Sequence, residues 1–79
     1  MDYEYWYKNA LEKLAILVSP GDSFELKGLF DAVTWENLSI GERCSFGRYF
    51  ASKVRDGKVP NVVETEQQKD RHNRYLKVL

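Results

Sequence analysis

The sequence lacks several features that would restrict its setting. Cys44 is the only cysteine among the 79 residues, so a disulfide framework is excluded and a reducing environment is expected. The longest apolar run, residues 14–18, is too short for a bilayer, which needs about 20 residues. The first residues are acidic, unlike the basic start of a secretory signal. These absences predict a soluble cytoplasmic protein with no membrane segment.

An excess of one charge is also missing. Basic and acidic residues number 12 each, which excludes a protein that is basic over its whole surface. The two halves differ, however. Residues 1–42 carry three basic and eight acidic side chains, whereas residues 43–79 carry nine basic and four acidic ones. This asymmetry favours an anionic partner for the basic half. The alternative is that the halves fold against each other and pair their charges.

Patterns of catalytic and cofactor-binding residues are absent as well. His72 has no second histidine or cysteine at metal-ligand spacing. Cys44 falls on the apolar face of a predicted helix with no histidine nearby, which favours a buried, inert thiol. Gly41 and Gly47 fit neither the Walker nor the dinucleotide-binding pattern. We therefore expect no enzymatic activity, no metal and no cofactor.

Helical periodicity dominates the first segment, about residues 3–18. Trp6, Ala10, Leu14 and Leu17 recur at spacings of four, four and three, as on the buried face of a helix. Asp2 is the expected N-cap. Residues 19–22, which include a proline and a glycine, should end the helix.

The next segment combines a short strand with a short helix. Residues 23–26 alternate apolar and polar side chains, which predicts one short strand. A second helix is expected over about 27–33, with Leu29, Phe30 and Val33 facing inward. Residues 34–38 are then a connector in which Trp35 and Leu38 are core anchors.

A third helix is predicted over about 40–56. Ser39 and Glu42 have the spacing of a capping box at its start, and Gly57 is a suitable residue for its end. Gly47 lies in the middle, which suggests that another element approaches closely there. The expected buried face consists of Ile40, Cys44, Gly47, Phe50, Ala51 and Val54.

The last part of the chain changes to an extended pattern. Residues 59–66 and 74–79 predict two strands of a β-hairpin, and the polar residues 67–73 predict its tip. A chain of 79 residues is too short for two ordinary domains, and 43% hydrophobic residues are too many for a disordered tail. The order of elements predicts a single α+β domain over 1–79 of winged helix–turn–helix type: three helices, a short strand that joins the hairpin, and a wing at the hairpin tip.

Two basic elements occupy the positions that this architecture uses to bind double-stranded DNA. The third helix would read the major groove, while the wing would meet phosphates. The candidate residues are Arg43, Ser45, Arg48, Ser52 and Arg55 on the helix, and Lys69, Arg71 and Arg74 on the wing. The leading hypothesis is a small bacterial or phage transcriptional regulator. A charged helix face is often only solvated, however, and Arg43 or Arg48 could instead pair with Asp31, Glu36 or Glu42.

A protein–protein interaction module of the same fold is the alternative. The isoelectric point of about 6.6 is low for a DNA-binding protein, where values above about 9 are usual. Aromatic residues are typical interface anchors, so the first helix could bind a second copy or a host protein through Tyr3, Tyr5, Trp6 and Tyr7. A structural accessory of a phage particle is a third hypothesis, for or against which the sequence has no feature.

Short motifs spread over residues 24–77 resemble those of a known family. They are Phe24-Glu-Leu-Lys-Gly-Leu-Phe30, Trp35-x-x-Leu38, Gly41-x-Arg43-x-x-Phe46-Gly47-Arg48-x-Phe50 and Tyr75-x-Lys77. The chain is thereby similar to very small bacterial and phage proteins described only as a domain of unknown function. The resemblance implies a compact domain closed by a hairpin. It transfers no catalytic residue and no ligand, and it leaves the first helix unmatched.

Overall fold

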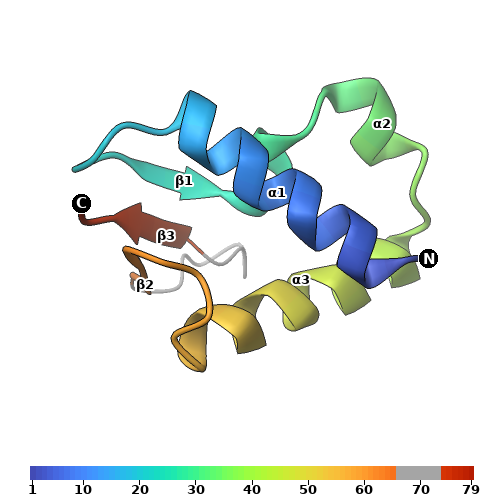
Figure 1. Ribbon diagram of the computed structural model, residues 1–79. Helices are drawn as coiled ribbons and strands as arrows, with labels where there is room; N and C mark the ends of the chain where they lie inside the picture. Colours follow the sequence, from blue (N-terminus) through green and yellow to red (C-terminus); the bar gives the residue numbers. More distant parts are fainter. Residues whose placement is uncertain (66–73) are drawn as a thin grey trace.

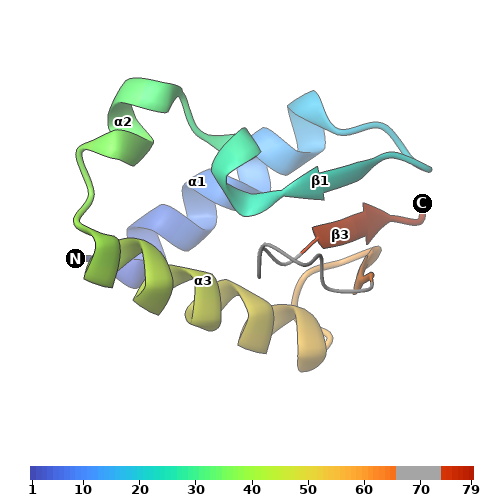
Figure 2. The same cartoon turned by 180° about the vertical axis from the view of Figure 1, so that it is seen from behind.

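The computed structural model describes residues 1–65 and 74–79 and has an α+β architecture. In chain order the elements are α1 (Tyr3–Leu17), β1 (Ser23–Glu25), the 3-10 helix η1 (Leu26–Leu29), α2 (Ala32–Glu36), α3 (Ile40–Arg55), β2 (Val62–Glu64) and β3 (Arg74–Lys77). In Figure 1, α1 crosses in front of the molecule, with α2 above it and α3 below it. Figure 2 shows from behind that the strands gather at the end of the molecule away from α2.

Helix α1 begins and ends close to the predicted positions. The Asp2 carboxylate accepts a hydrogen bond from the Tyr5 backbone N–H at 3.1 Å, so Asp2 is the N-cap. Ala10 and Leu14 are buried as predicted, and Val18, in extended conformation after the helix, is buried too. Leu17 is exposed, so its assignment to the buried stripe is wrong. At the end of α1 the buried side chains are those of Leu14, in the helix, and Val18, directly after it.

The segment after β1 differs from the prediction of one helix over 27–33. It contains η1, then an extended residue, Phe30, and only then α2. The Asp31 side chain fixes this start, because it accepts hydrogen bonds from the Thr34 backbone N–H (2.9 Å) and Thr34 Oγ1 (2.6 Å). A helix that begins after Asp31 directs Val33 to solvent, so the expectation that Val33 faces inward is wrong.

The two anchors expected over residues 34–38 are confirmed. Trp35 lies in α2 and stacks on Phe30, with ring centroids 5.7 Å apart, and Leu38 is buried. Trp35 is therefore part of a helix rather than of a connector.

The start and end of α3 agree with the sequence pattern. Ser39 Oγ accepts from the Glu42 N–H at 3.1 Å, while Glu42 Oε1 accepts from the Ser39 N–H at 2.9 Å. This reciprocal pair is the predicted capping box. The helix ends before Gly57, whose φ of 72° lies in the left-handed region that glycine adopts at little cost.

The buried face of α3 is rotated relative to the prediction. Phe50, Ala51 and Val54 are buried as expected, but Phe46 is fully buried, whereas Ile40 is 77% exposed. Four aromatic rings have centroids within 6.5 Å of that of Phe46, and they belong to Tyr3, Trp6, Phe30 and Tyr49. Aromatic residues of α1 and of the segment before α2 thus converge on Phe46 and set the orientation of the helix.

Two further expectations for α3 are wrong for the same reason. Cys44 is exposed, so it is not a buried thiol. A Cβ atom built at Gly47 would meet nothing within 4 Å, so no element approaches closely there. In this part of α3 the side chain that enters the core is that of Phe46, not that of Cys44 or Gly47.

The three strands form one antiparallel sheet in the order β1-β3-β2. Tyr75 of β3 lies opposite Phe24 of β1 on one side and Glu64 of β2 on the other. The predicted hairpin and its pairing with the short first strand are confirmed. The predicted tip, residues 67–73, lies outside the residues that the structure describes.

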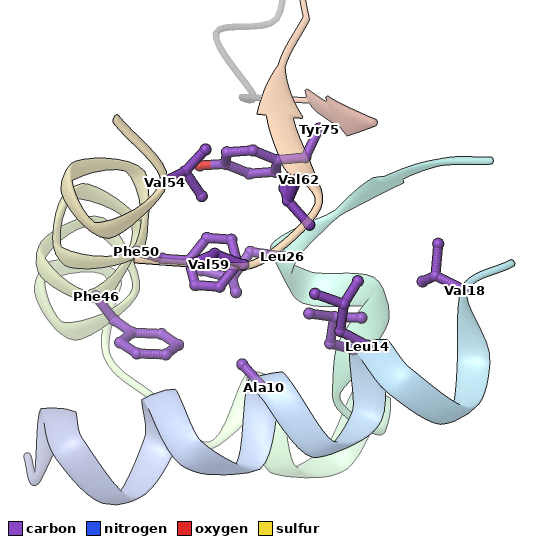
Figure 3. Close-up of a cluster of buried hydrophobic side chains, with 11 residues drawn as sticks. Ala10, Leu14, Val18, Leu26, Phe46, Phe50, Val54, Val59, Val62 and Tyr75 are labelled. Carbon is purple, nitrogen blue, oxygen red and sulfur yellow. The ribbon is translucent and has the colours of Figure 1, made fainter. Parts of the chain in front are cut away.

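The core lies between the helices and one face of this sheet (Figure 3). Its largest fully buried side chains are Tyr75, Phe46, Phe50 and Leu29. Phe50 meets Tyr75 edge to face, with centroids 5.1 Å apart, which links α3 to the central strand. The Lys77 ammonium donates to the Val18 carbonyl at 2.9 Å, which ties the same strand to the end of α1.

Candidate nucleic-acid interface

One side of α3 is turned away from the core, and we call it the outer face of α3. It consists of Gly41, Cys44, Ser45, Arg48, Ser52 and Arg55; Ser45 is half-buried and the others are exposed. Four of these residues are small and two are arginines, and none is acidic. A face of this kind combines positive charge with little steric bulk. Four of the predicted site residues are brought together on it.

Arg48 lies at the middle of this face. Its guanidinium is exposed and has neither a hydrogen-bond nor an ion-pair partner among residues 1–65 and 74–79. The expected alternative, a pairing of Arg48 with Asp31, Glu36 or Glu42, is not formed. All five N–H donors of the side chain are therefore available to a ligand.

Arg55 lies at the C-terminal end of the same face and is partly engaged. Its Nε donates to Glu64 Oε2 of β2 at 3.1 Å. The side chain is well exposed, and an exposed pair of this kind contributes little to stability, about 0–1 kcal/mol. The terminal nitrogens of Arg55 have no acceptor among the described residues, so the contact with Glu64 uses only the Nε donor and leaves the other four N–H donors available.

Arg43 does not lie on the outer face. Its Nη2 donates to the Glu36 carbonyl at the end of α2 at 3.1 Å, and its Nε is buried without a hydrogen-bond partner. A cation at the C-terminal end of a helix satisfies a carbonyl that has no partner within the helix. The position of Arg43 is that of a brace between α2 and α3, as the alternative hypothesis of helix-to-helix pairing expected.

The predicted wing residues are only partly covered by the structure. Arg74 is the first residue of β3, and its Nη2 lies 3.4 Å from Glu25 Oε1, while Lys27 lies 3.5 Å from the other oxygen of Glu25. Lys69 and Arg71 lie outside the described residues. Arg74 is thus on the sheet and next to an acidic residue, and it is not part of the outer face of α3.

The opposite side of α3 is occupied by α1. The ring of Tyr49 stacks on Tyr3, and the Lys53 ammonium lies 5.3 Å from the Tyr49 ring centroid. The Tyr49 hydroxyl donates to Glu4 Oε1 at 2.6 Å. This hydrogen bond raises the pKa of Tyr49 to about 12. Tyr49 and Lys53 are thus half-buried against α1 and do not belong to the outer face of α3.

Cys44 is an outer-face residue that the sequence pattern assigned to the buried face of the helix. Cys44 precedes Arg48 by four residues, the spacing of neighbours on one side of a helix. That spacing was a signal for its position. It was outweighed by the apolar character of cysteine, which favours burial.

The described part of the chain has no cluster of three His, Cys, Asp or Glu side chains arranged to hold a metal ion. His72 lies among the residues that are not described. No helix in residues 1–65 and 74–79 has the length and apolar character needed to cross a membrane.

Comparison with known proteins places the chain in a family. Residues 8–77 match the family model described as Domain of unknown function (DUF1413). The chain belongs to the DUF1413 family. The match begins in the first half of α1 and ends at the last residue of β3, so the DUF1413 domain includes most of the first helix, which the motif resemblance left out. No curated protein and no solved structure is detectably similar to this DUF1413 chain.

Proposed function

We propose that this protein is a DNA-binding domain of winged helix–turn–helix type, acting as a small transcriptional regulator. The observation that carries the proposal is the outer face of α3. It offers a guanidinium without a partner within the described residues, Arg48, among small side chains and without a carboxylate. The proposal assigns this face to the major groove of double-stranded DNA.

The arrangement of elements supports this assignment. Helices α2 and α3 are joined by the short turn 37–39, as in a helix–turn–helix unit. The strand order β1-β3-β2 includes the antiparallel pair of β2 and β3, as a winged domain would require. Arg43 braces α2 on α3 through the Glu36 carbonyl, which holds the two helices in a fixed relation. A rigid support is what a reading helix requires, because base contacts depend on accurate placement of side chains.

The residue types on the outer face suit both kinds of DNA contact. Arginine binds the O6 and N7 edge of guanine in bidentate fashion, and serine hydroxyls bond to bases or phosphates. Gly41, Ser45 and Ser52 would let the helix backbone come close to the groove. Arg48 would then be the longest side chain reaching from the centre of the face, so it is the residue we expect to read a base pair.

The charge of the molecule sets the kind of binding to expect. With no net charge, the protein gains little from a general attraction to polyanions. Affinity would come from a few local contacts by Arg48, Arg55 and the basic residues Lys69 and Arg71 of the proposed wing. We therefore expect weak binding to random sequences and a salt dependence that corresponds to a small number of phosphate contacts.

The proposal is tested by a fluorescence polarization titration of labelled duplex DNA at low salt. Arg48→Ala should weaken binding to a preferred sequence by about 1–3 kcal/mol, or roughly 5- to 150-fold, because a bidentate base contact is lost. Arg48→Ala combined with Arg71→Ala should weaken it further and lower the salt dependence by about one phosphate contact, the one assigned to Arg71.

Lys8→Ala is the matched control. It also removes one exposed positive charge, but from α1 rather than from α3. If Lys8→Ala and Arg48→Ala weaken binding equally, the effect is one of overall charge and the assignment to α3 fails. Absence of binding to any duplex DNA, including a random pool, would contradict the proposal as a whole.

The alternative of a protein-interaction module through the aromatic residues of α1 stays a prediction. Tyr3, Trp6 and Tyr7 are half-buried and pack against the core. Tyr7 also donates its hydroxyl hydrogen to the Lys58 carbonyl at 3.1 Å. Of the four aromatic residues on α1, only Tyr5 is exposed, at 63%.

A further inference from the structure

Ile40, the first residue of α3, is a large apolar residue that is exposed to solvent. Its side chain is 77% exposed and does not belong to the hydrophobic core that the described residues form. It does not serve the start of the helix either, because Ser39 and Glu42 form the capping box without it, and isoleucine favours a helix less than alanine or leucine does. Neither core packing nor helix formation therefore accounts for an isoleucine at this position.

The position of Ile40 is continuous with the outer face of α3. Ile40 precedes Cys44 by four residues, and Cys44 precedes Arg48 by four, so the three side chains follow one ridge along the helix. Gly41, directly after Ile40, has no side chain, and Cys44 is small and exposed. The ridge thus carries an apolar side chain at its N-terminal end and a guanidinium in its middle, with only a small side chain between them.

The next step rests on the function proposed above, in which the outer face of α3 lies in the major groove of DNA. In helix–turn–helix proteins the N-terminal residues of the reading helix contact base edges. Those edges carry hydrogen-bond donors and acceptors in the major groove, and the one apolar substituent among them is the C5-methyl group of thymine. The isoleucine side chain has no donor or acceptor, so this methyl group is the base atom it matches. We infer that Ile40 packs on the C5-methyl group of a thymine and selects that base within the site.

The geometry of the helix limits where this thymine lies. Ile40 and Arg48 are eight residues apart, which corresponds to about 12 Å along the helix axis. Base pairs follow one another at about 3.4 Å, so the thymine lies within about five base pairs of the base that Arg48 contacts. A β-branched side chain in a helix has one strongly preferred rotamer. Ile40 therefore loses little conformational freedom when it packs on the methyl group.

Replacement of thymine by deoxyuridine tests this inference, because it removes the C5-methyl group and leaves the Watson–Crick pairing unchanged. The preferred duplex is selected from a random pool with the wild-type protein, and each thymine on either strand is then replaced in turn. Binding is measured by fluorescence polarization at low salt. Replacement of at least one thymine should weaken binding by about 3- to 5-fold, the effect expected when one methyl group loses its contact.

Variants of Ile40 show which residue makes the contact. Ile40→Ala should weaken binding to the thymine duplex by at least the same factor, and its binding should not respond to deoxyuridine at that position. Ile40→Val keeps a branched apolar side chain, so it should keep a weaker response to deoxyuridine. Circular dichroism should show that both variants are folded, because the side chain is exposed.

Ile16→Ala is the matched control. Ile16 has the same residue type and the same exposure, 77%, as Ile40, but it lies on α1. It is next to Leu17, which lines a groove of about 410 Å³ along α1, and no residue of the outer face of α3 lines that groove. The groove is also lined by Tyr5 and Lys13 of α1 and by Asp31 and Thr34. Ile16→Ala should bind the thymine and deoxyuridine duplexes as the wild type does.

Two results would overturn the inference. One is a preferred duplex in which no thymine can be replaced with loss of binding, and the other is an equal response of the wild type and Ile40→Ala to deoxyuridine. If Arg48→Ala still weakens binding in either case, the function proposed for α3 stands and only the assignment of Ile40 fails. Absence of binding to every duplex would overturn both.

Discussion

At the scale of single residues, Phe46 decides which side of α3 is free to act. Its ring is fully buried among aromatic rings of α1, of the segment before α2 and of α3 itself. The sequence pattern placed Ile40 and Cys44 on the buried face instead, because both are apolar and fit a helical spacing. Periodicity alone could not find the correct rotation, since it depends on which aromatic residues of distant segments meet.

Truncation of two α3 residues should therefore have opposite outcomes. Phe46→Ala should lower the free energy of unfolding by about 3–5 kcal/mol, because it leaves a cavity in the core. Ile40→Ala should change it by less than about 0.5 kcal/mol, because the side chain is exposed. Urea denaturation followed by tryptophan fluorescence measures both. If the Ile40 variant lost as much stability as the Phe46 variant, α3 would have to pack on the core through a different face.

The hydrogen bond between Tyr49 and Glu4 makes a second prediction at this scale. It raises the pKa of Tyr49 to about 12, above the ordinary value of 10.0. A raised pKa in the folded state means that the associated stability is present below pH 10 and is lost as the pH rises through about 12. Glu4→Ala should lower the pKa of Tyr49 towards 10. A titration followed by the ring resonances of Tyr49 tests this, and an unchanged pKa would show that the hydrogen bond does not form in solution.

At the scale of elements, two helix starts that depend on hydrogen bonds between neighbouring residues were predicted correctly. The capping box of Ser39 and Glu42 and the N-cap Asp2 are of this kind. The region of α2 was predicted incorrectly because Asp31 was not recognised as the N-cap. Its hydrogen bonds to Thr34 begin the helix five residues later than the predicted start and leave Phe30 extended, with its ring against Trp6.

The capping box predicts an acid-sensitive start of α3. Hydrogen bonds from the backbone and hydroxyl of Ser39 hold the pKa of Glu42 below its ordinary value of 4.5. The stability from a lowered carboxyl pKa is present above the ordinary pKa and is lost as the pH falls through the lower, folded-state pKa. Glu42→Gln keeps the hydrogen bond to the Ser39 N–H but cannot titrate. Urea midpoints measured from neutral to acid pH should therefore fall less steeply for this variant than for the wild type, and equal slopes would contradict the prediction.

At the scale of the whole molecule, the sequence predicted the topology of the sheet and the grouping of Ser45, Arg48, Ser52 and Arg55. These follow from element order and from helical spacing. For Arg43 the sequence left a pairing with Glu36 open, but it did not predict that the acceptor is the Glu36 backbone carbonyl. It did not predict that Arg55 and Arg74 contact carboxylates, because those contacts join different elements of the fold. The groove along α1 could not be predicted from the sequence either, because its walls come from segments that meet only in the folded protein. The fold thus presents two separate surfaces, a basic one on α3 and a groove on α1 lined by both apolar and polar side chains.

The most direct test of the role of α3 is a map of amide chemical-shift changes when duplex DNA is added to isotope-labelled protein at low salt. The changes should centre on Ser45, Arg48 and Ser52 and should be absent from the side of α1 that carries Tyr5 and Lys13. They should weaken as salt is raised, because phosphate contacts release bound counterions. Shifts confined to the α1 groove, or no shifts at any DNA concentration, would contradict the assignment of the outer face of α3 to DNA.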